Sequence, residues 1–325
     1  MASIAISFVV TFSLTKRWIP VAKRAGFVGK DMNKPSNPEV AEMGGVAVLG
    51  GIVGGLLFYI GLNTFIFGNM SYNFALFAVL STVLIIAIVG LIDDILGWKL
   101  GLSQLQKPLL TVPAALPMMV INAGHSSVDL PMLGVVDLGI LYPLVAVPIG
   151  IVGASNGFNM LAGYNGLEAG MGIIMISSIG IISYLTGTSH VAMICAIAVA
   201  ALAAFFIFNC YPAKIFPGNV FTYMIGSIVA CVSILANVEK LALVLFIPYF
   251  LDFLLKSRSK MKAEAFGKVD AEGRLKKPYS KYYALPHIVI DVLLKLKVKT
   301  NEINVVRSIL LLEILFAIIG MFFYI

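Results

Sequence analysis

Two adjacent carboxylates stand at the end of a long apolar run, in "VGLIDDILGW". They are Asp93 and Asp94, and their like charges repel each other at a position where ionised groups are costly. Acids at the C-terminal end of a helix also oppose the helix dipole. Carboxylate oxygens suit Mg²⁺, and a carboxylate can accept a proton. We therefore predict a catalytic role for this pair, with Lys107 of "GLSQLQKPLL" as a clamp for a phosphate group.

Asparagines and glycines are interleaved in a second segment, "NGFNMLAGYNGLEAGMG", which begins at residue 156. Glycine lets the backbone approach a ligand closely, and asparagine amides offer acceptors for a cation and donors for a nucleobase or sugar. Small-residue packing between helices would explain the glycines, but it does not explain Asn156, Asn159 and Asn165. A further asparagine, Asn219, follows a Pro-Gly turn in "IFPGNVFTYMIGS". These amides are predicted to bind substrate or metal.

Two polar loops add candidate substrate contacts. The loop "GKDMNKPSNPEVAEMGG" contains Lys34 and Glu42, and residues 256–304 form the longest and most basic loop of the chain. The plain alternatives are a solvated loop for the first and a site for anionic lipid headgroups for the second. The last loop is, however, more aromatic than a charge tether requires. Its candidate substrate contacts are Arg258, Lys260, Lys262 and His287.

The composition shows which elements must position these residues. Of 325 residues, 60% are hydrophobic and 12% are charged, and the mean hydropathy is +0.98. Ordinary soluble domains carry roughly 25% charged residues, so a soluble enzyme is excluded and an all-α polytopic membrane protein is predicted. A span consumes about 20 apolar residues, which leaves room for only one integral membrane domain, 1–325. The net charge of +7 indicates how the protein is oriented in the membrane and that it binds anionic ligands, and it only weakly indicates nucleic-acid binding.

Apolar runs predict ten membrane-spanning helices. They cover residues 1–15, 44–62, 73–92, 105–123, 139–158, 167–185, 190–209, 220–236, 240–255 and 304–325. Residues 126–139 alternate apolar and polar side chains, which predicts a short β-hairpin at the membrane surface. One set of loops holds nearly all the Lys and Arg, whereas loops 63–72 and 186–189 hold none. By the positive-inside rule the basic side, with the acidic pair, faces the cytoplasm and both termini lie outside.

Four motifs follow one another along these spans. They are "DMNKP" with "PEVAEMGG", then "GLIDD" with its later lysine, then "NGFNMLAGYNGLEAG", then "FPGNVFTYMIG". This order resembles the polyprenyl-phosphate N-acetylhexosamine-1-phosphate transferases of glycosyltransferase family 4. Within that family the chain is most similar to the eukaryotic-type and archaeal dolichyl-phosphate GlcNAc-1-phosphotransferases, and less so to the bacterial translocase for MurNAc-pentapeptide. The resemblance extends from residue 31 to about residue 299.

The resemblance implies transfer of a sugar 1-phosphate, with GlcNAc 1-phosphate expected, from a UDP-sugar to a polyprenyl or dolichyl phosphate with release of UMP. It also implies a role for each matching residue. The family's acidic pair falls on Asp93 and Asp94, its pyrophosphate-contacting lysine on Lys107, its metal-binding asparagine on Asn159, its uracil-recognising residue on Asn165 with Gly163 nearby, and an acidic residue of the nucleoside pocket on Glu42. Asn219 stands where many relatives have a metal-binding aspartate. This substitution leaves the choice between Mg²⁺ and Mn²⁺ open.

Some family features have no counterpart here. The "RHRIPR" segment of the eukaryotic enzyme, which contacts the sugar and phosphates, is absent, and so are the three clustered histidines of the bacterial relative. The expected sugar therefore rests on overall likeness. A homodimer remains possible.

Two other classes of membrane protein share some of these features. A secondary transporter would also have many spans and polar residues, but it usually binds its solute near the bilayer midplane and shows internal repeats. Here the polar motifs gather at one face and no convincing repeat is seen. A CDP-alcohol phosphotransferase would need an aspartate-rich "DG…AR…G…D…D" run, which is absent. We therefore favour the lipid-phosphate transferase.

Overall fold

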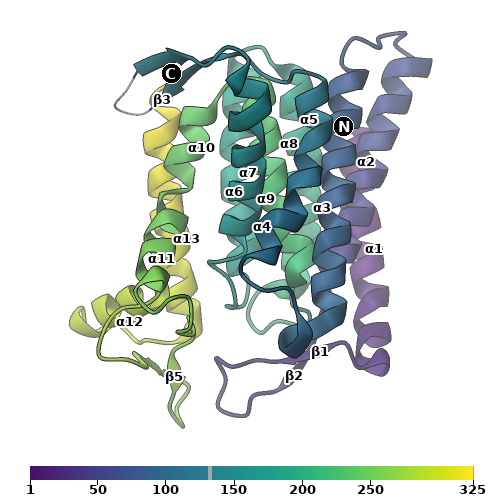
Figure 1. The fold of residues 1–325 in the computed structure, drawn as a ribbon. Helices are drawn as coiled ribbons and strands as arrows, with labels where there is room; N and C mark the ends of the chain where they lie inside the picture. Colours follow the sequence, from purple (N-terminus) through teal and green to yellow (C-terminus); the bar gives the residue numbers. More distant parts are fainter. Residues whose placement is uncertain (131–133, 325) are drawn as a thin grey trace.

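The computed structural model describes residues 1–130 and 134–324, which form a helical bundle with three short two-stranded sheets (Figure 1). Seven helices of the described chain are long and apolar enough to cross a membrane. They are α1 (Ala2–Ala25), α2 (Gly45–Phe65), α3 (Asn73–Leu100), α7 (Leu167–Leu185), α8 (Ser189–Asn209), α9 (Gly218–Ala236) and α13 (Glu302–Met321). In α3, non-helical dihedral angles at Gly97 produce a kink beyond the acidic pair.

Three other predicted spans are interrupted helices. These pieces are α4 (Gln106–Thr111) with the 3-10 helix η1 (Val112–Ala115) and α5 (Leu116–Val120), the π-helix η2 (Tyr142–Ala146) with α6 (Val147–Phe158), and α10 (Glu239–Leu245) with α11 (Ile247–Ser257). Proline occupies the first or second position of η1, α5, η2, α6 and α11. Proline lacks an N–H donor, so it favours the start of a new helical piece over a continuous helix. The predicted number of ten spanning helices is therefore not confirmed, and seven are found.

Both termini nevertheless lie at the same end of the bundle (Figure 1). Seven passages, an odd number, would leave the termini at opposite ends. The interrupted segments, which are α4 with α5, α6, and α10 followed by α11, also run lengthwise beside the long helices (Figure 1). The end without the termini carries the strands β1 (Val28–Lys30) and β2 (Glu39–Ala41) and the helix α12 (Leu285–Lys295).

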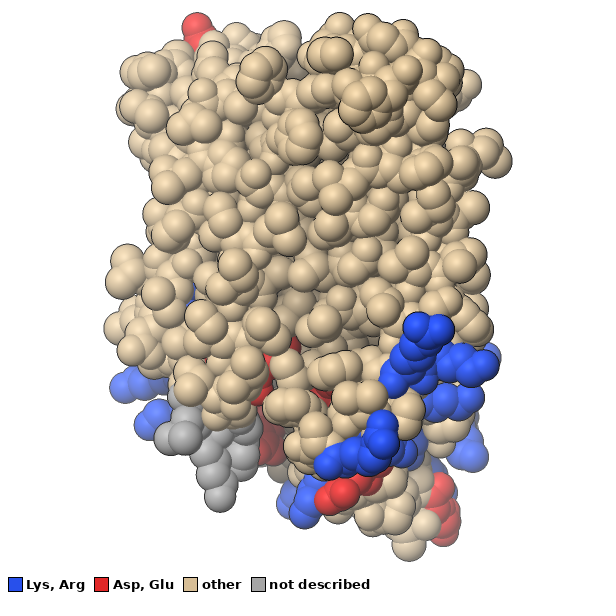
Figure 2. Space-filling model, turned by 90° about the vertical axis from the view of Figure 1, so that its right-hand side faces the viewer, with Lys and Arg blue, Asp and Glu red and all other residues tan. Residues whose placement is uncertain are grey.

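The side wall of the bundle is apolar, and the charges gather at one end. Leu57, Phe77, Ile88 and Leu315 are among the exposed large apolar side chains. Figure 2 shows a wall almost free of charge above a rim of Lys and Arg. Helix α1 continues past its predicted end at residue 15 and brings Lys16, Arg17, Lys23 and Arg24 to this rim. We call the rim, which also holds β1 and β2, the basic end; such a surface fits a lipid-embedded protein.

The three sheets are antiparallel pairs. Strands β3 (Ser127–Leu130) and β4 (Gly134–Asp137) pair with Ser127 opposite Asp137, which confirms the predicted hairpin, although its turn at 131–133 lies outside the described residues. Strands β1 and β2 form a second pair at the basic end. The third pair, β5 (Lys268–Val269) and β6 (Leu275–Lys276), belongs to the last basic loop.

Helices α1 and α2 pack through small side chains. The buried residues of α1 include Ser3, Ser7, Thr11 and Thr15, while its apolar residues such as Val9 face outward. This polarity is the reverse of a soluble helix and typical of packing between membrane helices, where small residues let backbones approach. On α2, a Cβ at Gly51 would lie 2.7 Å from the carbonyl oxygen of Ser7 and would also collide with Thr11. Gly51 therefore sets the distance between the two helices.

We predict that Gly51→Val lowers the stability of the detergent-solubilised protein by about 2 kcal/mol, because an overpacked interface must shift its backbone. The matched control is Gly54→Val on the same helix, since a Cβ at Gly54 meets no atom within 4 Å. Thermal unfolding followed by circular dichroism measures both. Equal melting temperatures for the two variants would contradict the packing assignment.

Candidate functional site

A cavity of about 230 Å³ opens at the basic end. Its walls come from five parts of the chain: the β1–β2 region, the loop 159–166, the first turn of α7, the segment that leads into α9 and the last basic loop. The lining residues are Lys30, Asp31, Met32, Glu42, Asn159, Ala162, Gly163, Tyr164, Glu168, Phe216, Pro217, Gly218, Asn219, Thr222 and Phe266. Four of the predicted site residues, Glu42, Asn159, Gly163 and Asn219, are thus brought together.

Backbone hydrogen bonds bring Glu42 to Asn219. The Phe216 N–H donates to the Ala41 carbonyl at 2.7 Å, and the Gly44 N–H donates to the Phe216 carbonyl at 3.0 Å. Strand β2 is thereby tied to the segment that leads into α9, although the two lie far apart in the sequence. Burial, and secondarily the charge of Asp94, raise the pKa of Glu42 above its usual value. Glu42 therefore faces the cavity as a carboxyl group that holds its proton more tightly than a solvated one.

The Asp94 carboxylate accepts hydrogen bonds from the first turn of α9. The Asn219 N–H donates to Oδ1 at 2.7 Å and the Val220 N–H donates to Oδ2 at 3.1 Å. Free N–H groups at a helix N-terminus form a natural anion site, and the helix dipole adds to the attraction. Gly218 permits this approach, because it has a φ of 74° and its Cβ would lie 2.7 Å from Oδ2. Helix dipoles thus stabilise the charge of Asp94.

Asp93 has different partners. Lys107 Nζ lies 2.9 Å from its Oδ2, the Tyr223 hydroxyl donates to the same oxygen at 3.1 Å, and the Leu102 N–H donates to Oδ1 at 2.8 Å. The side chain of Asp93 is buried, whereas Lys107 is partly exposed. The structure therefore brings Lys107 to Asp93, whose neighbour in the chain is Asp94. The ion pair also fixes where the Lys107 ammonium stands.

The glycine-rich loop 159–166 forms another wall of the cavity. The Gly163 N–H donates to Glu168 Oε1 at 2.8 Å, while Glu168 Oε2 is buried without a partner among the described residues. Gly163 has a φ of 102°, and a Cβ there would lie 2.7 Å from the Phe266 ring. Asn159 Oδ1 accepts a hydrogen bond from the Thr222 hydroxyl at 2.8 Å. The sequence reasoning did not single out Glu168, although it is an acid in the first turn of a span; Phe266 carries no comparable sequence signal.

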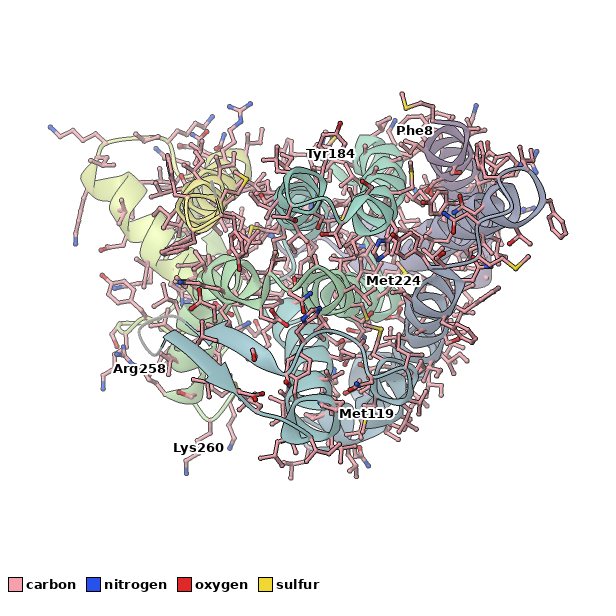
Figure 3. All side chains as sticks on the ribbon, turned by 90° about the horizontal axis from the view of Figure 1, so that it is seen from above. Phe8, Met119, Tyr184, Met224, Arg258 and Lys260 are labelled. Atoms are coloured by element: carbon pink, nitrogen blue, oxygen red, sulfur yellow. The ribbon has the colours of Figure 1, made fainter. Side chains whose placement is uncertain are left out.

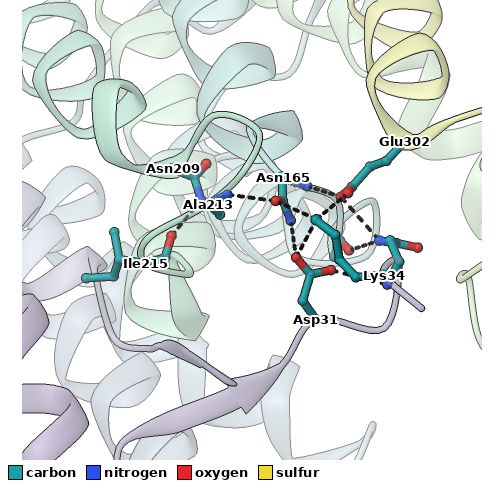
Figure 4. A network of polar contacts seen from close by, with 9 residues as sticks. Asp31, Lys34, Asn165, Asn209, Ala213, Ile215 and Glu302 are labelled. Carbon is teal, nitrogen blue, oxygen red and sulfur yellow. Dashed lines mark hydrogen bonds and ion pairs between the residues drawn. The ribbon is translucent and has the colours of Figure 1, made fainter. Parts of the chain in front are cut away.

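A buried polar network stands behind this loop (Figure 4). Lys34 Nζ lies 2.6 Å from Asp31 Oδ2 and 2.7 Å from Glu302 Oε2, and it donates to Asn165 Oδ1 at 3.0 Å. Burial opposes the charge of Lys34, but its hydrogen bonds to Asp31 and Glu302 prevail and raise its pKa. Asn165 also donates to Asp31 at 3.2 Å and accepts from the Ala213 N–H at 2.8 Å. Lys34 and Asn165 thus lie next to the cavity and are engaged with the protein itself.

Glu302, which the sequence reasoning did not single out, closes the network from the last helix. Its Oε1 accepts from the Asn165 N–H at 2.7 Å and from Asn33 Nδ2 at 3.4 Å. Asn33 Nδ2 also donates to the Gly163 carbonyl at 2.9 Å, which connects the network to the cavity wall. The available signal is weak: an acid just after the Asn301 cap, in the first turn of a span. The network fixes the shape of the loop 159–166.

The other predicted substrate contacts do not line the cavity. Asn156 donates to the Thr111 hydroxyl at 3.0 Å and to the Val152 carbonyl, which joins α6 to α4. His287 is buried, its Nδ1 accepts from the Tyr283 N–H, and burial lowers its pKa. Arg258, Lys260 and Lys262 are exposed. In Figure 3, Arg258 and Lys260 point away from the bundle at its periphery.

The oxygen donors at the cavity fit a hard cation that needs few protein ligands. Among the described residues there is no group of three His, Cys, Asp or Glu side chains that could enclose a metal ion. Mg²⁺ does not need such a cage, because it usually takes one or two carboxylates together with water and substrate phosphates. Asn159 and Asn219 line the cavity, and Asp94 accepts from the Asn219 backbone. One carboxylate and two amide oxygens have the chemistry that Mg²⁺ requires.

We predict that Lys34→Met destabilises the protein by about 3 kcal/mol, because removal of one member of a buried ion-paired cluster leaves carboxylates uncompensated. Lys276→Met is the control, since Lys276 is largely exposed and its pairing with Asp270 spans 3.5 Å; exposed pairs contribute at most about 1 kcal/mol. Thermal unfolding in detergent compares the two. If Lys34→Met lost no more stability than Lys276→Met, the proposed stabilising role of Lys34 would be wrong.

Comparison with known proteins identifies the family of the chain. Residues 76–237 match the sequence pattern described as glycosyl transferase family 4. A protein of Saccharolobus solfataricus, named as a candidate UDP-N-acetylglucosamine–dolichyl-phosphate N-acetylglucosaminephosphotransferase, is 38% identical over 98% of this chain and 94% of its own length. The protein of the same description from Sulfolobus acidocaldarius is 37% identical over 99% and 95%. A phospho-N-acetylmuramoyl-pentapeptide-transferase of Halalkalibacterium halodurans is 30% identical over 75% and 77%. The chain therefore belongs to glycosyl transferase family 4.

Proposed function

We propose that this protein transfers N-acetylglucosamine 1-phosphate from UDP-N-acetylglucosamine to dolichyl phosphate or another polyprenyl phosphate. The products are UMP and a lipid-linked pyrophosphoryl sugar, with which assembly of a lipid-linked glycan begins. The family and the names of the two archaeal relatives support this activity. The observation that carries it is the meeting of Asp93, Asp94 and Lys107 near a polar cavity at the basic end of an apolar bundle.

In this proposal the cavity receives the nucleotide. Phe266 offers an aromatic face for stacking of a base, and Gly163 allows the backbone to approach that ring. Glu42 and Asn159 supply polar groups on the neighbouring walls. Asn165 acts from behind the cavity, because its amide already has partners in Lys34, Asp31 and Ala213.

The pyrophosphate of the donor requires positive charge. Asp94, Asn159 and Asn219 would hold a divalent cation, Mg²⁺ or Mn²⁺, which when bound neutralises phosphate charge and polarises the phosphoryl group. The amide oxygen of Asn219 is a neutral ligand, and it adds no third negative charge beside Asp93 and Asp94. Lys107 would contribute a second positive charge to the same phosphates.

The reaction is an in-line displacement at the phosphorus that carries the sugar. An oxygen of the lipid phosphate forms a new bond to this phosphorus, while the bond to the UMP oxygen breaks and UMP leaves with the electron pair. An ionised lipid phosphate needs no general base. Asp93 accepts from Lys107, Tyr223 and Leu102, so its proposed role is to hold the Lys107 ammonium where the phosphates are bound.

We further propose a single membrane domain with ten crossings, in which the interrupted segments cross together with the seven long helices. The even number agrees with the position of both termini at one end (Figure 1). Lys and Arg at the opposite end support a cytoplasmic orientation of the cavity and external termini. A UDP-sugar would then reach the cavity from the cytoplasm, and the polyprenyl chain would remain in the bilayer.

The decisive experiment uses the purified protein with UDP-GlcNAc labelled in the sugar, a short-chain dolichyl phosphate and Mg²⁺. We expect label in the lipid extract and an equal amount of UMP. The rival transporter would instead move the labelled nucleotide sugar into proteoliposomes without lipid labelling or UMP release. That result would refute the transferase.

Within this assay, Asp94→Asn is expected to lower kcat by about a hundredfold or more, the size of effect seen when one preorganised electrostatic group of an active site is removed. The control is Asp270→Asn in the turn between β5 and β6, which lies outside the cavity lining and should retain wild-type turnover. Both proteins must elute as folded species in size-exclusion chromatography. Wild-type turnover by Asp94→Asn would reject the assignment of the acidic pair.

Gly163→Ala tests the nucleotide wall. The new methyl group would lie 2.7 Å from the Phe266 ring, and we expect the KM for the UDP-sugar to rise about tenfold, or about 1.4 kcal/mol. Gly273→Ala is a matched control, because Gly273 also has a positive φ of 72° but its Cβ would meet no atom within 4 Å. It also places an alanine at a positive φ, but without the collision. If Gly163→Ala and Gly273→Ala raised KM equally, the collision with Phe266 would not be the cause. Gly163 would then not belong to the wall that binds the nucleotide.

A further inference from the structure

Helix α12 lies across the bundle axis at the basic end and extends beyond the side of the bundle (Figure 1). Its inner face is fixed: Ile290 and Leu293 are buried, and the Leu285 N–H donates to Asp252 Oδ1 at 2.7 Å. Asp252 in turn pairs with Lys256 at 2.9 Å. The helix is therefore held firmly against α11 and does not hang from a flexible loop.

The C-terminal end of α12 and the residues that follow it expose several apolar side chains. Val292 is 45% exposed, Leu294 49%, Leu296 66% and Val298 42%, and no other part of the described chain covers them. They alternate with the exposed residues Lys295, Lys297 and Lys299. Apolar side chains beside Lys on a helix crosswise to the spans are the pattern of a helix in the membrane interface.

A groove of about 450 Å³ runs beside this face. It is lined by Glu272, Arg274, Leu294, Lys297, Val298, Lys299 and Thr300. Arg274 is neutralised by Asp270 and Glu272, and Lys295 by Asp291. Lys297 and Lys299 have no ion pair within residues 1–130 and 134–324. The groove therefore carries two uncompensated positive charges beside the apolar side chains of Leu294 and Val298.

We propose that α12 and residues 296–299 dock on an anionic membrane surface and that the groove binds the headgroup of an anionic glycerophospholipid. Leu294, Leu296 and Val298 enter the boundary of the acyl chains, while Lys297 and Lys299 pair with the headgroup phosphate. Only an occupant that is both apolar and anionic matches the alternation of the two kinds of side chain. The surface is separate from the cavity lined by Glu42 and Asn159, and its test requires no transferase activity.

Insertion of this surface is measured with the full chain in lipid nanodiscs. A fluorophore is attached at Leu296→Cys in a Cys210→Ser background, because Cys195 and Cys231 are buried. Lipids brominated near the headgroup should quench this label strongly, and they should leave a label at Ser36→Cys, in the exposed loop between β1 and β2 and away from the groove, unquenched. Equal quenching at both positions, or none at residue 296, would overturn the docking proposal.

Headgroup selectivity is measured by native mass spectrometry of the detergent-solubilised chain with added phosphatidylglycerol or phosphatidylcholine. We expect a preference for phosphatidylglycerol that falls at least threefold in Lys297→Gln/Lys299→Gln and persists in the control Lys268→Gln/Lys276→Gln, which removes two charges from the neighbouring β5–β6 pair. An unchanged preference in the first variant would refute the headgroup site. Displacement of the lipid by millimolar inorganic phosphate would identify a site for soluble anions and equally refute it.

Discussion

The cost of placing charge in an apolar bundle organises this structure. Three carboxylates at or beside the site have their own sources of compensation: Asp93 has the Lys107 ammonium, Asp94 has the N–H groups that open α9, and Glu302 has Lys34. Such groups remain ionised away from water only where donors are already in place. The backbone must therefore deliver helix ends, loops and a lysine to one level of the bundle. The cavity forms where these elements meet.

The two adjacent aspartates differ in the kind of compensation they receive. Asp93 is bound by the ammonium group of a long side chain in addition to the Leu102 N–H, whereas Asp94 is bound by backbone dipoles of the first turn of α9. A cation can be shared with an incoming phosphate, but a backbone N–H cannot leave its helix. The positive charge beside Asp93 can therefore shift towards a substrate during a reaction, whereas the dipoles beside Asp94 keep their geometry. Dipoles that are already in place before the reaction are the basis of electrostatic preorganisation.

Sequence reasoning located the acidic pair, the apolar character of the bundle and four residues of the cavity wall, because each has a local signal. It did not find Glu302 or Phe266, whose importance depends on contacts with Lys34 and Gly163 far away in the chain. It assigned Asn165 to the ligand, since a motif reveals an amide but not the partners that occupy it. Apolar runs also predicted continuous spans where prolines divide the helices, because hydropathy does not register a missing N–H donor.

Glu302, which completes the polar network with Lys34 and Asn165, lies at the start of α13, the last helix described in the chain. Synthesis proceeds from the N-terminus, so α13 leaves the ribosome after the other helices that the structure describes. Until it inserts, Lys34 and the backbone of Asn165 lack the carboxylate that joins them to each other. The loop 159–166 therefore takes its final shape only after α13 has entered the membrane. A nascent chain carries nearly all the residues of the site without yet being able to bind as the finished protein does.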